Sequence, residues 1–216
     1  MIRTRITFAK TPAMRYTGHL DLHRAWERTF RRAGLPLAYS EGFNPHPRLN
    51  LASALPLGFT GAGEVIDAWL EQDLPLPDIQ AALQCALPPG LQVTQIETVD
   101  LRLPALQTEL EASEYSLTFL EPCPELADRV QALLSALSLP RQRRERDYDL
   151  RPLILDIQIL PMGASHPLDG SGQPQLNLRL VAREGATGRP EEVIAALGYD
   201  PQLVRVHRNR LLFRVG

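Results

Sequence analysis

Lysine is almost absent from this sequence of 216 residues, in which 22 of the 23 basic side chains are arginine and only Lys10 is lysine. Because arginine stands at every other basic position, we interpret Lys10 as a place that needs a compact charge. Cysteine is scarce too: Cys85 and Cys123 belong to no C-x-x-C pair and to no set with metal-ligand spacing. The sequence therefore lacks an iron–sulfur motif and a disulfide framework, and we expect two reduced packing thiols.

Other signals are missing as well. No apolar run approaches the roughly 20 residues of a membrane-spanning helix, and the first residues lack the apolar core of a signal peptide. There is no glycine-rich phosphate loop and no G-x-S-x-G motif. These absences predict a soluble, cytoplasmic protein without a recognisable cofactor motif. The apolar fraction of 44% is ordinary for globular proteins, and the length fits one large domain or two small ones.

The net charge of −2 conceals a strong polarity along the chain. Residues 1–60 carry nine basic side chains against three acidic ones, a net charge of +6. Residues 61–140 carry two arginines against thirteen acidic residues, and residues 141–216 carry twelve arginines against nine. A chain with this distribution presents one region that attracts anions and another that repels them.

Residues 1–100 show the hydrophobic patterning of a β-α-β-β-α-β unit. Strands are predicted at 2–8, 49–55, 63–71 and 91–99, and helices at 20–33 and 74–87. In the first helix the apolar stripe of Leu22, Trp26 and Phe30 lies opposite the arginine side chains. This element order is that of the ferredoxin-like split unit, in which two helices cover one face of an antiparallel sheet.

The second half repeats this plan less clearly. Strands are predicted at 115–120, 151–160, 175–183 and 203–213, helices at 124–137 and 190–197, and exposed connections at 141–146 and 161–174. The arginine-rich run 141–146 is a second candidate anion patch or a solvated loop. We predict an α+β fold of two ferredoxin-like (βαββαβ) halves with antiparallel sheets, residues 1–100 and 114–216, joined by a linker over 101–113.

Residues 10–48 combine basic, aromatic and turn-forming side chains, which indicates a functional surface. The turn at 42–48 (GFNPHPR) brackets a histidine with two prolines and is costly to build for packing alone. Arginines that neutralise phosphates and aromatic rings that stack on bases are typical of RNA binding, although helix arginines also occur as a merely solvated face. The predicted binding residues are Lys10, Arg15, Tyr16, Arg24, Arg28, Arg31, Arg32, Tyr39, Phe43, Asn44 and Arg48.

Histidines in the same segment suggest two kinds of chemistry. His19 and His23 stand one helical turn apart and could share a metal with His46, but Asp21 between them projects away and suits the start of a helix. We therefore predict no metal site. General acid–base catalysis by His19, Asp21 and His46 stays open as an alternative, with Lys10 in the same pocket.

The residues that make this segment unusual also resemble a known family. RYTGHLDL at 15–22 and RRAGLPLAYSEGFNPHPR at 31–48 are similar to the signature of the DUF2344 family, also called radical SAM-linked or radical SAM-associated proteins. ALPLG at 54–58, followed by Glu64 and Asp67, and DLRPLI at 149–154 continue the likeness. The resemblance implies an accessory or substrate-recognition role beside a radical SAM enzyme, encoded near ribosome- and RNA-processing genes, and it assigns no established reaction. Since the cysteine motif is missing, the chain is not that enzyme.

Three hypotheses follow. The first is a module that recognises RNA, rRNA or tRNA, for a radical SAM partner. The second is an enzyme acting on a phosphorylated or nucleotide substrate, which requires His19 and His46 to lie within roughly 10 Å of each other. The third is an interaction scaffold whose acidic middle region docks the radical SAM enzyme. We expect the turns at 16–21 and 42–48, which flank the same helix, to lie close together.

Overall fold

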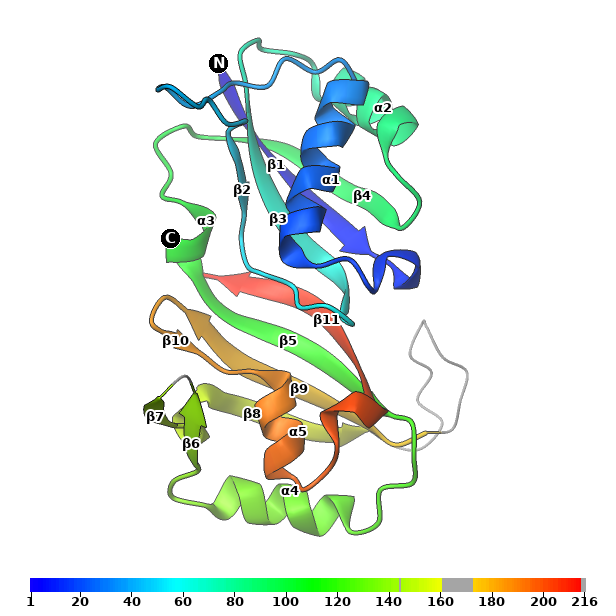
Figure 1. The fold of residues 1–216 in the computed structure, drawn as a ribbon, viewed down its shortest axis with the longest axis vertical. Helices are drawn as coiled ribbons and strands as arrows, with labels where there is room; N and C mark the ends of the chain where they lie inside the picture. Colours follow the sequence, from blue (N-terminus) through cyan, green and yellow to red (C-terminus); the bar gives the residue numbers. More distant parts are fainter. Residues whose placement is uncertain (144, 161–172, 215–216) are drawn as a thin grey trace. The chain divides into compact units, whose positions relative to one another are not determined.

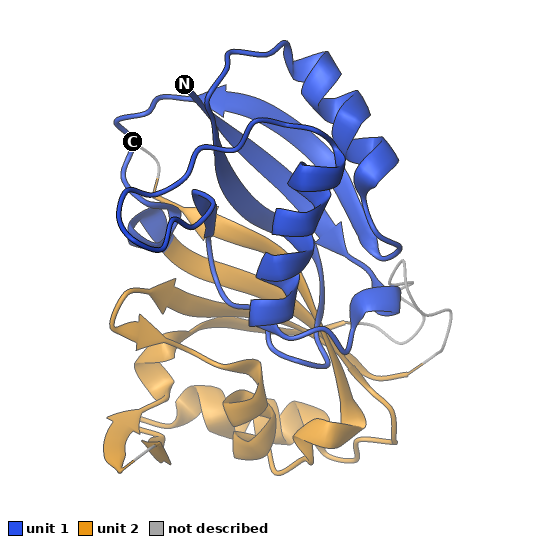
Figure 2. Ribbon diagram, turned by 45° about the horizontal axis from the view of Figure 1, so that its top comes forward, with its two compact units in different colours: residues 1–110 blue, residues 111–216 orange. Residues whose placement is uncertain are grey.

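The computed structural model of the chain describes residues 1–143, 145–160 and 173–214. They form two compact units, Met1–Leu110 and Glu111–Gly216 (Figure 2). Within these residues no helix is both long and apolar enough to cross a membrane. The connection predicted at 161–174 lies outside the described residues, apart from its last two positions.

Unit 1 contains an antiparallel sheet built around its first strand. β1 (Ile2–Lys10) pairs with β3 (Thr60–Leu70) on one side and with β4 (Leu91–Val99) on the other. The short β2 (Leu49–Leu51) pairs with β3, so the strand order is β2-β3-β1-β4 (Figure 1). The alternating residues of β1 predicted this strand, and its buried and partly exposed positions alternate over most of its length.

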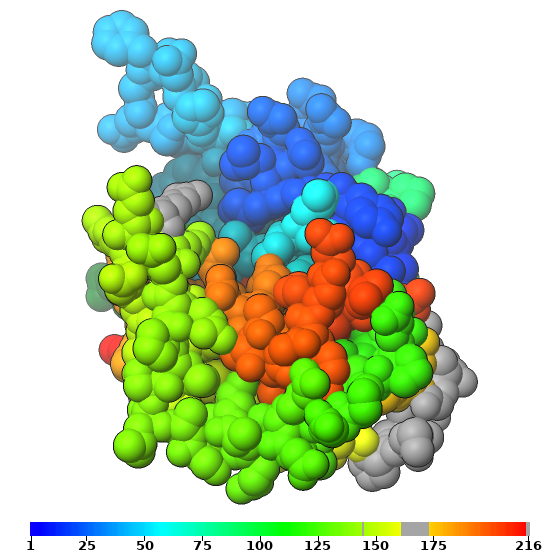
Figure 3. Space-filling model, turned by 60° about the horizontal axis from the view of Figure 1, so that its bottom comes forward, coloured from blue at the N-terminus to red at the C-terminus, as the bar shows by residue number. Residues whose placement is uncertain are grey.

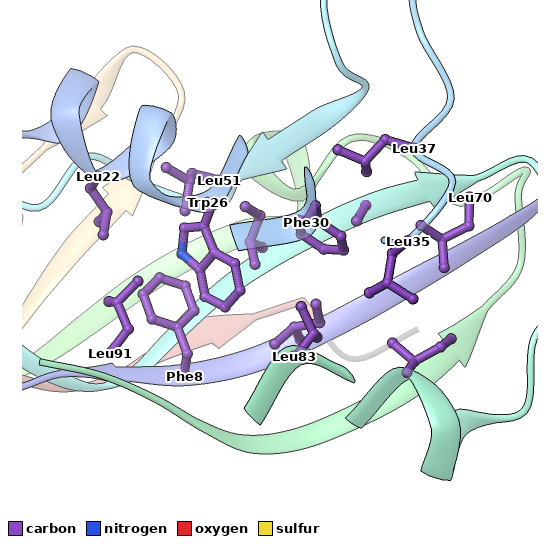
Figure 4. Packing of buried hydrophobic residues seen from close by; sticks show 14 residues of the cluster. Phe8, Leu22, Trp26, Phe30, Leu35, Leu37, Leu51, Leu70, Leu83 and Leu91 are labelled. Atoms are coloured by element: carbon purple, nitrogen blue, oxygen red, sulfur yellow. The ribbon is translucent and has the colours of Figure 1, made fainter. Parts of the chain in front are cut away.

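Two helices, α1 (His19–Arg32) and α2 (Leu76–Ala86), cover one face of this sheet (Figure 1). Phe8 of β1 meets Trp26 of α1 edge to face, with 4.9 Å between ring centroids, at the centre of the apolar core (Figure 4). Both residues are completely buried, and burying an aromatic side chain is among the largest favourable contributions to folding. The same core contains Ile6, Leu22, Phe30, Leu35, Ile66, Leu70, Ile79 and Leu83.

The opposite face of β1 carries a buried ion pair. Nε of Arg3 donates a hydrogen bond of 2.8 Å to Oδ2 of Asp67, and Nε of Arg5 donates one of 2.9 Å to Oδ1 of the same carboxylate. Arg3 and Asp67 are 1% and 0% exposed. The Arg3 guanidinium also donates to the carbonyls of Leu103 and Pro104, so it ties the chain after β4 to the sheet.

Two segments of unit 1 differ from the sequence expectation. The strand predicted at 49–55 ends at Leu51, because the chain then turns through Pro56, which has no N–H to donate, and Gly58, whose φ is +86°. The linker predicted at 101–113 is partly folded: it contains the helix α3 (Leu106–Glu109) and the start of the next strand. Leu106 is fully buried, which explains why this segment is ordered despite its weak pattern.

Unit 2 is also built on paired strands. β9 (Gln175–Arg183) pairs antiparallel with β5 (Leu110–Phe119) and with β8 (Ile154–Leu160), and β11 (Val204–Phe213) is the other neighbour of β5. The short β10 (Ala186–Thr187) forms a hairpin with β9. The strand order is therefore β8-β9-β5-β11. Together with unit 1, this confirms the prediction of an α+β fold with mainly antiparallel strands.

The helices of unit 2 are α4 (Leu126–Ser135) and α5 (Pro190–Ala196), and both bury apolar side chains. β5 begins earlier than the predicted residue 115, because the acidic side chains that weaken its pattern have basic partners. Glu114 accepts hydrogen bonds from Arg179 and Arg210, and the bond from Arg210 is the main reason that the pKa of Glu114 is lowered. The predicted connection at 141–146 is wrong for its described strand residues, since 141–143 and 146 belong to the paired strands β6 (Pro140–Arg143) and β7 (Arg146–Asp149).

Candidate functional site

Lys10, the only lysine, is buried at the end of β1. Its ammonium donates hydrogen bonds of 3.3 Å to the carbonyl of Arg15 and 2.8 Å to that of Thr17, in the turn that precedes α1. Its side chain is completely buried, so Lys10, which was predicted as a binding residue, does not lie on the exposed surface of unit 1. A compact ammonium with three donors fits between two converging carbonyls where a planar guanidinium does not.

We expect the substitution Lys10→Met to destabilise unit 1 without changing its surface charge. The two turn carbonyls would lose their donor, which should lower the free energy of unfolding by about 1–3 kcal/mol in urea denaturation. Arg24→Met is the control, because Arg24 is 65% exposed and its ion pair within the described residues is with the exposed Asp21. Equal stability of the two variants would contradict the structural role of Lys10.

His23 and Asp21, in the first turns of α1, make local pairs. Nδ1 of His23 lies 3.1 Å from Oε1 of Glu27, one turn further along the helix. Asp21 stands in the first turn and lies 3.4 Å from the Arg24 guanidinium. His19 is the first residue of α1 and is partly exposed. Within the described part of the chain, no three His, Cys, Asp or Glu side chains are grouped as a metal site requires.

Residues 42–48 form the outer part of an exposed loop. The backbone N–H of Ser40 donates to the carbonyl of His46, and the N–H of His46 donates to the Ser40 hydroxyl, which closes the stem. Tyr39 forms an isolated antiparallel β-bridge with Pro47 at the base of this stem. Residues 41–46 are exposed, and Phe43 is 105% exposed. The light-blue segment that contains this loop stands clear of the rest of unit 1 in Figure 3.

The two turns that we expected to meet lie at opposite ends of α1. The turn at 16–21 follows Lys10, at the end of β1, and Tyr16 is 80% exposed there. The loop stem joins the other end of the sheet, where the N–H of Trp69 donates to the carbonyl of Arg48. Between them runs a helix of 14 residues, about 20 Å long at 1.5 Å per residue (Figure 1). The predicted convergence of the two turns is therefore wrong, and this separation does not support a shared acid–base site for His19 and His46.

The structure instead brings the helix arginines together with an aromatic residue of the loop stem. A groove of about 690 Å³ lies between the outer face of α1 and residues 34–47. Arg24, Arg28 and Arg31 line one wall, and Tyr39 and Pro47 line the other. Arg28 and Arg31 have no ion-pair partner among the described residues. Glu27 is the only carboxylate in the lining against these three arginines, so the lining carries a net positive charge.

The remaining predicted binding residues lie elsewhere. Arg32 points to α2, where it donates a hydrogen bond of 2.6 Å to the carbonyl of Ala86. Arg48 stacks over Trp69 at 5.0 Å, on the ring that Arg3 also contacts. Asn44 is exposed in the loop, while the turn that contains Arg15 lies at the far end of α1. The sequence reasoning missed Pro47 and Gly34 as groove residues, because apolar and glycine positions carry no charge signal.

The fold and the groove define an α+β protein with antiparallel sheets and a basic, aromatic surface groove. The chain belongs to the family DUF2344, described as an uncharacterized protein conserved in bacteria, whose family model matches residues 3–190. No curated protein sequence matches the chain.

Solved structures with a related chain path have low identity and TM-scores below 0.5. They include a Cbf5-Nop10-Gar1 complex (TM-score 0.49, 13% identity, 96% of this chain and 48% of that one). An H/ACA RNP bound to a substrate RNA containing 2′-deoxyuridine has a TM-score of 0.46 at 13% identity, with coverages of 96% and 47%. The archaeal box H/ACA sRNP Nop10-Cbf5 complex has a TM-score of 0.44 at 14% identity, with coverages of 99% and 49%. The chain spans about half the length of each.

Proposed function

We propose that unit 1 binds unpaired segments of structured RNA, such as the loops of rRNA or tRNA, in the groove along α1. The observation that carries this proposal is the placement of Arg24, Arg28 and Arg31 on one wall, with Tyr39 on the other wall and Phe43 on the adjoining loop. Single-stranded nucleic acids expose both phosphates and base faces. Arginine guanidiniums bind the phosphates, and exposed aromatic rings stack on the bases.

The phosphate contacts come from a rigid element. Positions 24, 28 and 31 fall on one face of α1, and they span about 10 Å along its axis. Trp26 and Phe30, on the inner face of the same helix, are completely buried, so the helix cannot rotate without breaking the core. The three guanidiniums are therefore preorganised along a short stretch of backbone, which lowers the entropic cost of binding.

The base contacts come from the loop. Tyr39 is 54% exposed and Phe43 is fully exposed, although both rings are apolar. The hydrogen bonds between Ser40 and His46 hold the loop stem, and Pro45 and Pro47 stiffen the strand that returns. An aromatic ring that points to solvent from a stiff loop is suited to stack on an unpaired base.

The test is direct binding of RNA hairpins at a series of salt concentrations. For about three phosphate contacts to a single strand, log K should fall against log salt with a slope of about −2. Phe43→Ala should weaken binding about tenfold, since stacking contributes about 1–3 kcal/mol per base. Leu137→Ala is the matched control, because Leu137 is 99% exposed and lies in unit 2. Binding that is absent or insensitive to salt would overturn the proposal.

A finer description of the fold belongs to the same proposal. We infer that each unit is a ferredoxin-like βαββαβ half, residues 1–100 and 114–216. The strand orders β2-β3-β1-β4 and β8-β9-β5-β11 support this inference, since each places the first strand of its unit between the third and the last. The hairpin β6–β7 is then an insertion in the second half.

The partner and the location stay predictions. A radical SAM enzyme as partner is implied by the family resemblance, and an acidic region at 61–140 that docks it remains the scaffold hypothesis. Co-purification of the two proteins would decide between these roles and RNA binding alone. A cytoplasmic location is expected for a protein that binds rRNA or tRNA.

A further inference from the structure

Unit 2 contains a second basic groove, of about 720 Å³, which lies apart from the groove on α1 in sequence. One wall is the hairpin of β6 and β7, and the other comes from the β9–β10 hairpin and the residues before α5. In Figure 3 the yellow-green segment of the first wall lies against the orange segment of the second. Arg143, Arg146 and Arg189 line the groove together with Tyr148.

The register of the hairpin explains why its basic side chains gather. Arg141 is opposite Tyr148, and Arg143 is opposite Arg146. Since side chains alternate across a strand, these four residues share one face of the hairpin, while Gln142 and Asp147 point to the other. The sequence shows only a run of arginines, and the pairing converts it into a one-sided basic surface.

The groove arginines lack partners within the described residues. None of Arg143, Arg146 and Arg189 has a carboxylate within ion-pair distance there, and the buried Nε of Arg189 has no hydrogen-bond acceptor. The only carboxylate in the lining, Asp149, accepts hydrogen bonds from the N–H groups of Leu139 and Arg151. Those bonds lower the pKa of Asp149, so it is ionised at neutral pH, and the lining carries three guanidiniums against this one carboxylate. An excess of guanidiniums over carboxylates in one groove favours the binding of an external anion.

The phenol of Tyr148 adds a donor and a flat ring. Burial is the main reason that the pKa of Tyr148 is raised, so the hydroxyl keeps its proton at neutral pH. The volume of the groove is within the range of small-molecule sites and exceeds what a bare phosphate ion fills. An aromatic ring beside three guanidiniums offers both a stacking surface and a phosphate cradle.

We propose that this groove binds the terminal phosphate of a nucleotide, held by Arg143, Arg146 and Arg189, with Tyr148 against its sugar or base. The nucleotide is either free or the 5′ end of an RNA chain, since both present the same phosphate monoester. This site is independent of the groove on α1, and neither proposal requires the other.

The experiment is calorimetric titration of the full chain with adenosine 5′-monophosphate and with adenosine at low ionic strength. We expect binding of the monophosphate and at least tenfold weaker binding of adenosine. Arg146→Gln and Arg189→Gln should each weaken the monophosphate about ten- to one-hundredfold, as expected for loss of a charge-assisted contact. Arg183→Gln is the matched control, an exposed arginine of β9 outside the groove, and it should bind as the wild type does.

Competition then identifies the source of the phosphate. If an RNA with a 5′-phosphate displaces the monophosphate and the same RNA with a 5′-hydroxyl does not, the ligand is an RNA end. If neither RNA displaces it, the ligand is a free nucleotide. Equal binding of adenosine and its monophosphate, or wild-type affinity in both Arg146→Gln and folded Arg189→Gln, would overturn the proposal. Arg28→Glu changes the groove on α1 and should bind the monophosphate as the wild type does. Failure of the nucleotide proposal can therefore be distinguished from failure of the RNA proposal.

Discussion

The double substitution Arg28→Glu and Arg31→Glu should reduce RNA binding by at least about a hundredfold, because it removes two charge-assisted contacts and places carboxylates against the phosphates. Both side chains are exposed and unpaired within the described residues, so the change should leave the fold intact. The slope of log K against log salt should become less negative by about 1.4, corresponding to two phosphates lost from a single strand. Filter binding across salt concentrations measures both quantities.

The control for this variant must change the net charge equally. Arg102→Glu with Arg183→Glu does so at two exposed positions, one in each unit and both outside the two grooves. If RNA binding depended only on overall charge, the two double variants would weaken it to the same extent. Equal weakening would refute recognition in the groove and would leave only a general attraction between a basic surface and RNA.

The substitution Asp67→Ala should be the most damaging change in unit 1. The Asp67 carboxylate is completely buried and accepts hydrogen bonds from both Arg3 and Arg5, and Arg3 is itself 1% exposed. Removing the carboxylate leaves the buried Arg3 guanidinium without its counter-ion, which should cost about 3–5 kcal/mol of unfolding free energy. Chemical denaturation followed by tryptophan fluorescence measures this loss.

A second variant separates the cost of a buried charge from the value of the pair. Arg3→Met combined with Asp67→Leu replaces both groups by apolar side chains of similar size. This double variant should be more stable than Asp67→Ala, because no buried charge is left uncompensated. If it were less stable, the hydrogen bonds of Arg3 to the carbonyls of Leu103 and Pro104 would be the main contribution, and the idea of a charge penalty would fail.

Local patterning predicted much of the secondary structure. The alternation of residues 2–8 indicated β1, and the apolar stripe of Leu22, Trp26 and Phe30 indicated α1 and its inward face. The same helical period placed Arg24, Arg28 and Arg31 on the outer face, where they line the groove. These inferences succeeded because each depends on residues within two turns or one strand of each other.

Features that depend on contacts between residues far apart in the sequence were predicted wrongly or missed. The paired strands 140–143 and 146–149 were mistaken in part for a connection, because their charged residues suggest a loop and only pairing makes them strands. The early start of β5 depends on Arg179 and Arg210, which follow it by more than 60 residues. The buried pair of Arg3 and Asp67 was likewise absent from the sequence reasoning, since 64 residues separate its members.

The sequence by itself determined that residues 10–48 are rich in basic and aromatic side chains, and that Lys10 is the single lysine. Tertiary structure decided what each of them does. It buried Lys10, because the turn before α1 brings two carbonyls to the end of β1, where a compact ammonium satisfies both. It also separated the two turns by the length of α1 and joined the helix arginines to Tyr39, because a rigid helix fixes distances that sequence spacing leaves free.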